Sequence, residues 1–158
     1  MDFRVSREAF LRVLTHVSSI VDSRSTIPIL SNIYLKCENN QIEIRSTDMD
    51  ISIREFVSCD STKNGEATVN SRILTDIIRK TKKNSIVKCK LEGNRLIINS
   101  DNSVFELNAL SADEFPKFVP LDPKNLFELT IPQIKRIFNK TKFAISAEET
   151  RYYLNGIY

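Results

Sequence analysis

Hydrophobic residues recur three and four positions apart in three segments of the chain. In residues 6–17 the apolar positions are Phe10, Val13, Leu14 and Val17. This spacing places them on one side of a helix, and the segment begins with a serine, which suits an N-cap. The pattern predicts three amphipathic helices, over 6–17, 71–83 and 131–142.

Between the helices, apolar and polar residues alternate, as at Ile42 and Ile44. A period of two is typical of strands with one covered face. Turn-forming pairs at 39–40 and 93–94 separate neighbouring strands and predict hairpins. We expect strands over 3–5, 31–37, 41–46, 50–58, 66–70, 85–91, 95–100 and 103–110.

The chain repeats its own beginning. Residues 3–34 align without a gap onto residues 127–158, with six identical pairs that include Arg12 and Arg136. Most apolar positions of the first segment stay apolar in the second. Self-similarity at a fixed offset is typical of repeated structural units. The sequence therefore predicts one complete domain followed by the opening of a second copy.

A shorter repeat lies inside the first copy. The helix at 71–83 and its following hairpin repeat the pattern of the helix at 6–17 and its hairpin, except for about ten extra residues within 18–30. These residues are either a tolerated surface insertion or a functional loop. The predicted fold class is α+β, with a duplicated βαβββ unit followed by a βαβ segment.

Three prolines within 110–123 indicate a linker between the two copies. We therefore expect domains at 1–122 and 123–158. A helix restarts after the linker, where Thr130 and Gln133 have capping-box spacing.

Composition excludes several classes of protein. The chain has no run of eighteen apolar residues and no secretory leader, so we expect a cytoplasmic protein that neither spans nor binds a membrane. Cys37, Cys59 and Cys89 are widely spaced and are expected to be reduced and buried. With His16 as the only histidine, we expect no metal site and no cofactor.

Charge is distributed unevenly between the helices and the rest of the chain. The three helical segments hold eleven basic residues and two acidic ones, whereas the chain as a whole has a net charge of +3. If the helices share one side, they form a positive surface that attracts phosphate without reading base sequence. The alternative is that lysine and arginine simply solvate the polar faces of the helices.

Catalytic patterns are absent from the sequence. The three glycines, Gly65, Gly93 and Gly156, are isolated, so no phosphate-binding loop exists. The acidic cluster at Asp48 and Asp50 is either a hard-cation site or a polar turn between strands. We expect a protein that is not an enzyme, either a DNA-contacting structural protein or a β-rich module that binds other proteins.

Four segments closely resemble motifs of the bacterial DNA polymerase III beta subunit family, the replicative sliding clamps. They are RSTIPILSN at 24–32, STDMD at 46–50, DEFP at 113–116 and RYYLNG at 151–156. The resemblance implies a DNA clamp fold with helices on the DNA-facing side and sheets outside. It also implies a homodimeric ring around double-stranded DNA that acts as a non-catalytic processivity factor.

The resemblance further implies partners and DNA-binding residues. The partners are the DNA polymerase III catalytic subunit, the clamp loader, and other clamp-binding polymerases and repair proteins. Arg24 matches the family's DNA-contacting arginine, and Tyr152 and Tyr153 match a tyrosine pair near the DNA path, although at least one tyrosine is expected to pack beneath the second domain. The basic helical residues expected to contact phosphate are Arg72, Arg79, Lys80, Lys83, Lys135, Arg136 and Lys140.

Two further surfaces follow from the resemblance. Arg151 and Leu154 match part of the pocket for partner peptides, whose remaining residues come later in family members. Phe105, Leu107 and Ile73, together with the neighbouring arginine at 72, match the ring interface, although ordinary edge-strand packing is the alternative.

Two positions depart from the family pattern, and the chain is shorter than family members. Glu148 stands where well-known members carry an uncharged DNA-contacting glutamine, and a carboxylate there repels phosphate. Ile73 replaces a basic residue at the ring interface. We expect an N-terminal fragment that binds partner peptides poorly and does not close a ring by itself.

Overall fold

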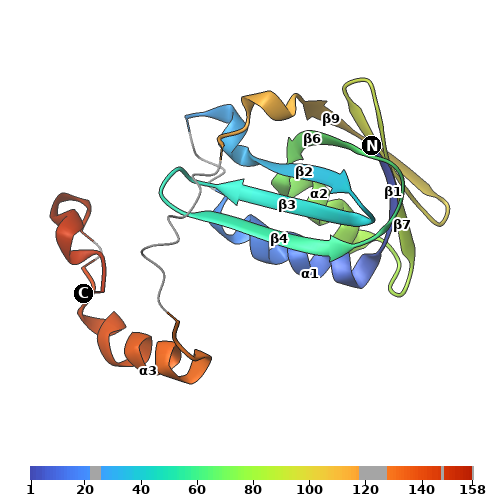
Figure 1. Cartoon of the computed structure of the whole chain (residues 1–158). Coiled ribbons are helices and arrows are strands. Elements are labelled where there is room, and N and C mark those ends of the chain that lie inside the picture. The colour runs from blue at the N-terminus through green and yellow to red at the C-terminus, as the bar shows by residue number, and fades with distance from the viewer. Residues whose placement is uncertain (22–25, 118–127, 147, 158) are drawn as a thin grey trace. The chain divides into compact units, whose positions relative to one another are not determined.

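The computed structural model describes residues 1–21, 26–117, 128–146 and 148–157. Two compact units make up the chain, Met1–Phe118 and Val119–Tyr158. The helices are α1 (Arg7–Val17), α2 (Ser71–Lys80) and α3 (Ile131–Thr141), with short 3-10 turns η1 (Ser18–Ile20), η2 (Pro28–Ser31), η3 (Ala112–Glu114), η5 (Lys142–Ala144) and η6 (Glu149–Leu154). The strands, labelled in part in Figure 1, are β1 (Asp2–Ser6), β2 (Asn32–Glu38), β3 (Gln41–Thr47), β4 (Ser52–Ser58), β5 (Asp60–Lys63), β6 (Gly65–Asn70), β7 (Ile86–Glu92), β8 (Arg95–Ser100) and β9 (Ser103–Leu110).

The described strands of the first unit form an antiparallel sheet in the order β4-β3-β2-β6-β9-β8-β7-β1-β5. Two βαβββ units are present, as the internal repeat predicts. Each unit gives its first strand to the other, because β1 pairs with β7 and β6 pairs with β2. Neither unit therefore completes its sheet by itself.

Strand β5 is not predicted by the sequence pattern. Only Cys59 separates it from β4, so one nearly continuous segment pairs with β3 at one end of the sheet order and with β1 at the other. The Cys59 backbone N–H donates to the Asn40 carbonyl at 2.9 Å, and the Ser61 N–H donates to the Asn40 side-chain oxygen at 3.0 Å. Strand β5 contains only polar residues, which explains why alternation misses it.

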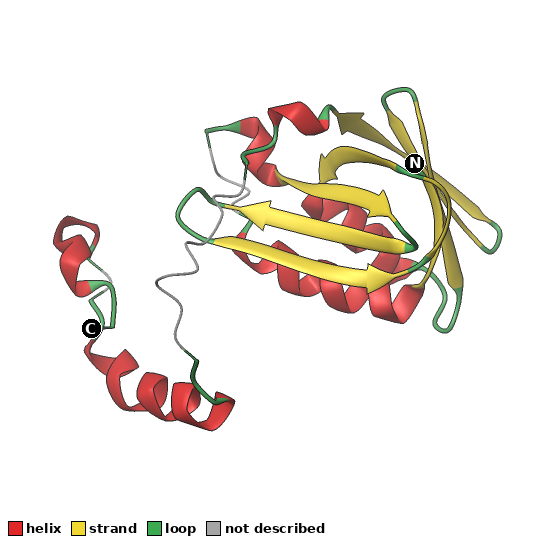
Figure 2. Cartoon of the chain, in the orientation of Figure 1, coloured by secondary structure: helices red, strands yellow, loops and turns green. Residues whose placement is uncertain are grey.

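Both helices of the first unit lie on the same side of the strands β2, β3 and β4 (Figure 2). The four apolar residues predicted to form the stripe of the first helix are all buried, with Leu74 and Ile78 beside them from α2. They pack in one core with inward residues of both sheet halves, such as Leu35 and Ile98. The predicted core faces of these two helices are therefore confirmed.

Helices α1 and α2 run antiparallel, and polar contacts join them at both ends. At one end the Ser18 hydroxyl lies 2.7 Å from that of Ser71. At the other, the Arg7 guanidinium donates to the carbonyl oxygens of Ile78 and Arg79 at 3.1 and 2.7 Å. These are carbonyls of the last turn of α2, where a cation also interacts favourably with the helix dipole. Arg7 is thus a bridge between the helices, not part of an outward basic face.

Helix α2 ends at Lys80, three residues before the predicted end. Thr81 adopts an extended conformation, and its hydroxyl donates to the Ile78 carbonyl at 2.8 Å. The Ser85 hydroxyl then donates to the Lys82 carbonyl at 2.7 Å, which stabilises the turn into β7. Competition from these hydroxyls for backbone groups explains the early end.

The described part of the predicted linker packs on the first unit. Phe115 is buried, and its ring lies 5.7 Å from that of Tyr34. The Tyr34 hydroxyl donates to the Glu66 carboxylate, and the Arg45 guanidinium lies 4.8 Å from the centre of the Tyr34 ring. Burial, followed by this hydrogen bond, raises the pKa of Tyr34 far above its ordinary value. Residues 111–117 are therefore anchored to the first unit and do not form a free linker.

The described residues of the second unit form α3, η5 and η6. The Thr130 backbone N–H donates to the Gln133 side-chain oxygen at 2.8 Å, which is the reciprocal half of a capping box. The apolar residues of α3, Ile134, Ile137 and Phe138, are 40, 41 and 53% exposed. The helix is formed as predicted, but no described element covers its apolar stripe.

Replacing Arg7 with alanine should destabilise the first unit by about 1–3 kcal/mol, because two carbonyls at the end of α2 lose a charged donor. The exposed Arg12→Ala variant on the same helix is the control, with an expected change within about 0.5 kcal/mol. Urea unfolding followed by circular dichroism measures both. Equal stabilities of the two variants would contradict the bridging role of Arg7.

Candidate nucleic-acid interface

The outward faces of α1, α2 and the turn after α2 form a layer of exposed basic side chains. Its members come from two helices that pack against each other, so the chain brings them together on one side of the sheet. We call this set the basic layer, and it consists of Arg12, Arg72, Arg79, Lys80, Lys82 and Lys83. Arg12 and Lys82 were not assigned to the predicted site, although their positions in the helical segments would have indicated them.

Both acidic residues of α1 and α2 have local partners. Glu8 accepts a hydrogen bond from the Asn84 backbone N–H at 2.8 Å, and this bond is the main cause that lowers the pKa of its carboxyl group. Asp76 accepts from the Arg79 guanidinium at 2.8 Å. Arg79 is therefore partly neutralised, while the lysines of the basic layer have no such ion pair among the described residues.

The opposite face of the sheet presents both signs of charge in close pairs. Lys36 lies 2.8 Å from Glu38, and Lys90 lies 2.5 Å from Glu92. Arg95 and Glu106 are 2.7 Å apart. These ion pairs offset part of the positive charge of this face, whereas the lysines of the basic layer have no acidic partner among the described residues.

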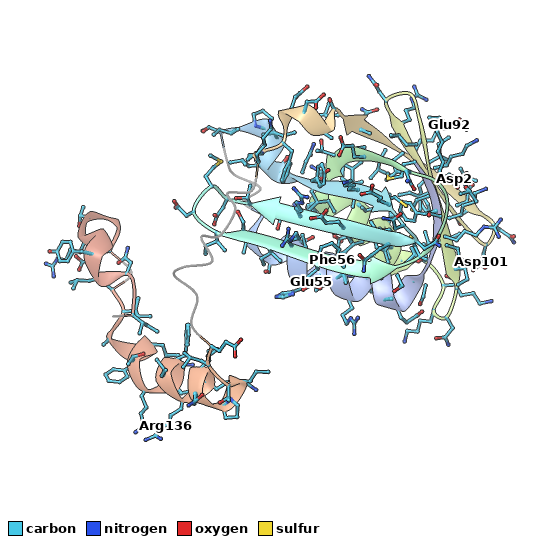
Figure 3. All side chains as sticks on the ribbon, in the orientation of Figure 1. Asp2, Glu55, Phe56, Glu92, Asp101 and Arg136 are labelled. Atoms are coloured by element: carbon cyan, nitrogen blue, oxygen red, sulfur yellow. The ribbon has the colours of Figure 1, made fainter. Side chains whose placement is uncertain are left out.

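Successive side chains of β4 point alternately to the helical face and to the opposite face of the sheet. Figure 3 labels its neighbours Glu55 and Phe56. Glu55 pairs with the exposed His16 of α1, whereas Phe56 belongs to the other face and is 49% exposed. The alternation of the strand thus assigns Glu55 to the helical side, where it is an acidic neighbour of the basic layer.

A hollow of about 760 Å³ lies beside the first turns of α2. Arg72, Ile73 and Arg79 line it, together with Val21 and Ser31 from the segment that joins α1 to β2. This segment, from Ser18 to Ser31, is longer than its counterpart after α2, as the repeat predicts. Arg24, the predicted DNA contact, falls within it but outside the described residues.

The remaining predicted DNA-binding residues belong to the second unit. Lys135, Arg136 and Lys140 are exposed on α3, and Arg136 points away from the helix in Figure 3. Tyr153 is 71% exposed in η6. The side chain of Tyr152 lies outside the described part of the chain.

The predicted pocket residues also lie in η6. The Arg151 guanidinium forms an ion pair with Glu148 at 3.1 Å, and Leu154 is 43% exposed. Glu148 is the residue that departs from the family pattern, and its carboxylate is paired with the Arg151 guanidinium. The negative charge of Glu148 is therefore paired in this chain.

The three predicted interface residues differ in their environments. Ile73 is 52% exposed, Phe105 is partly buried against the core, and Leu107 is only 6% exposed within it. The outward neighbour Val104 is 64% exposed and was not predicted. Residues 103–107 of β9 pair only with β8 among the described strands, so the other edge of this stretch remains open.

The acidic cluster between β3 and β4 forms a turn. The Asp48 carboxylate accepts from the backbone N–H groups of Asp50 and Ile51 at 3.0 and 2.6 Å. Within the described ranges, no group of three metal-ligating side chains occurs. None of the described helices is long and apolar enough to cross a membrane.

Comparison with known proteins points to a single family. Residues 1–120 match the model for the N-terminal domain of the DNA polymerase III beta subunit. The chain is 37% identical over 160 residues to the beta sliding clamp of Caulobacter vibrioides, and 33% identical over 159 residues to that of Pseudomonas aeruginosa. These alignments cover 100 and 99% of this chain but only 43% of each relative.

Solved structures give the same result. A Caulobacter crescentus beta sliding clamp superimposes with a TM-score of 0.94 at 36% identity, and a sliding clamp from Bartonella birtlesii bound to griselimycin with 0.94 at 35%. Each comparison covers 99% of this chain and 42% of the other. The predicted clamp fold is confirmed.

Neutralising the basic layer should weaken duplex binding equally for every base sequence. In a Lys80→Gln/Lys83→Gln variant, each lost phosphate contact should reduce the slope of log affinity against log salt by about 0.9. The matched control is Lys36→Gln/Lys90→Gln on the opposite face. Fluorescence anisotropy with two unrelated duplexes at several salt concentrations measures both, and an equal loss in the control would remove the basic layer from the interface.

Proposed function

The chain belongs to the DNA polymerase III beta subunit family, and on this premise we propose that it is the N-terminal part of a replicative sliding clamp. The complete protein forms a homodimeric ring around double-stranded DNA and acts as a processivity factor. It performs no chemistry itself. The ring holds the polymerase III catalytic subunit and other clamp-binding polymerases and repair proteins near DNA after a clamp loader has opened it. All of these partners act in the cytoplasm.

The observation that carries this proposal is that α1 and α2 lie on the same side of the sheet. The two halves of the internal repeat present exposed basic residues of α1 and α2 on one side of the sheet, while Lys36 and Lys90 of the other face pair with acidic residues. A β-rich adaptor has no need to align its basic helices in this way. The alternative of a protein-binding module is therefore less consistent with the arrangement.

The physical basis of processivity is topological. A ring around a duplex needs only to be unable to leave it, so its contacts with phosphate can be weak and indifferent to sequence. Long lysine and arginine side chains suit such contacts because they follow the phosphates as the ring moves. A tethered polymerase then meets its primer end at a high effective concentration.

Each predicted site residue has a role in this proposal. Arg24 and the basic layer contact phosphate in the first domain, and the basic residues of α3 do so in the second. Tyr152 and Tyr153 lie near the DNA path, where a base can stack on an aromatic ring. Arg151 and Leu154 form one side of the partner-peptide pocket.

At the ring interface, the exposed Ile73 and the partly buried Phe105 contact the next subunit, and Val104 extends this apolar surface. The open edge of β9 supports this assignment because its unpaired backbone groups can accept another strand. Leu107 supports the same strand from inside the core.

The full-length protein should stay on circular DNA after loading and be lost from the ends of linear DNA. Retention is measured by gel filtration of loaded complexes before and after the circle is cut with a restriction enzyme. Nicking the circle is the control, because it leaves the ring closed on DNA. Equal retention on cut and intact DNA would mean ordinary surface binding and would contradict encirclement.

Replacing Arg24 with alanine in the full-length protein should reduce loading or retention, because one phosphate contact is lost, without changing the melting temperature. Lys36→Ala is the control, since Lys36 pairs with Glu38 on the opposite face. The circular-DNA assay and thermal unfolding are run together. Unchanged retention would remove Arg24 from the site.

A further inference from the structure

Two of the three cysteines lie against each other in the core of the first unit. The sulfur atoms of Cys37 on β2 and Cys59 at the β4–β5 junction are 3.9 Å apart. Their side chains belong to residues that are 0 and 8% exposed, and both are free thiols, as the sequence predicts. Cys89 on β7 is also fully buried and is a free thiol.

The two thiols of the pair differ in access from solvent. Cys59 lines a hollow of about 320 Å³, whose other lining residues include Arg4, Asp60 and Ile86. Cys37 does not line this hollow and is fully buried. A small reagent that enters the hollow therefore reaches Cys59 before Cys37.

We propose that Cys59 and Cys37 form a thiol pair that a low-molecular-weight disulfide, such as oxidised glutathione, converts into an internal disulfide. The Cys59 thiolate attacks one sulfur of glutathione disulfide, forms a mixed disulfide and releases one glutathione. The Cys37 thiolate then attacks the Cys59 sulfur and releases the second glutathione. The two cysteines lose two electrons, which reduce one glutathione disulfide, and their two protons pass to the two glutathione thiolates.

The reduced pair reacts slowly at neutral pH. Burial, the neighbouring Cys37 and the Asp60 carboxylate raise the pKa of Cys59 to about 12, so little thiolate is present. The amino group of Met1 interacts with Cys37, and Arg4 lines the same hollow as Cys59. The rate of oxidation therefore rises with pH.

The disulfide would join β2 to the segment that contains β4 and β5. This segment pairs with β3 at one end of the strand order and with β1 at the other. The disulfide closes a loop from residue 37 to residue 59, which restricts the unfolded chain more than the folded one. Oxidation should therefore raise the melting temperature of the first unit, and reduction with dithiothreitol should restore the original value. This device is independent of DNA binding and of the proposed function.

The test is incubation of the whole folded chain with oxidised glutathione under mildly alkaline conditions, followed by mass spectrometry of the protein and its peptides. The wild-type chain should lose the mass of two hydrogen atoms and give a peptide linking Cys37 to Cys59. Cys37→Ala should stop at a glutathione adduct on Cys59, whereas Cys59→Ala should stay unmodified. Cys89→Ala is the matched control and should form the same disulfide as the wild type.

Two results would overturn the proposal. One is modification of Cys89 as fast as that of Cys59 in the folded wild-type chain, because it would mean that unfolding exposes all the thiols together. The other is a folded wild-type chain that forms no link between Cys37 and Cys59 while the chain in urea reacts fully. Both results come from the wild-type chain, so they do not depend on the folding of a variant.

Discussion

The exchange of first strands between the two βαβββ units determines the rest of the first domain. Strand β1 completes the second half of the sheet and β6 completes the first. Helices α1 and α2 lie antiparallel on one side of this sheet and pack over one core. The basic layer lies on the outward side of these two helices.

The paired helices divide the basic residues into two groups. Arg7 bonds the last carbonyls of α2 and stabilises the antiparallel pair, and Arg79 is held by Asp76. The exposed residues of the basic layer that lack such partners are the ones that we propose as phosphate contacts. Arg7, which joins the helices, and the lysines that face outward come from the same short segments. The contacts that stabilise the helix pair therefore also fix where the exposed positive charges lie.

Most elements of the fold could be predicted from the sequence, because helical stripes and alternation reflect which face of each element is buried. Strand β5 could not, since its polar residues form a strand only through pairing with β1. The anchoring of Phe115 on Tyr34 and the burial of Leu107 arise from tertiary packing that local patterns do not contain. The sequence predicts that basic helical residues make up the candidate DNA surface. It does not predict the structural role of Arg7, which depends on the end of α2 lying beside it.

Comparing α1 with α3 shows which property comes from the repeated sequence and which comes from tertiary packing. The repeat gives each helix an apolar stripe, whereas the burial of the stripe depends on neighbouring elements. Both helices carry the same apolar stripe, yet Phe10 and Leu14 are fully buried while their counterparts Ile134 and Phe138 are 40 and 53% exposed. Full burial of such a side chain is worth about 1.5–3 kcal/mol, so most of the stability of α1 comes from the strands and helix that cover it. No described element covers α3 in this way. The basic residues of α3 therefore lack the packing that fixes the position of α1 through β3, β4 and α2.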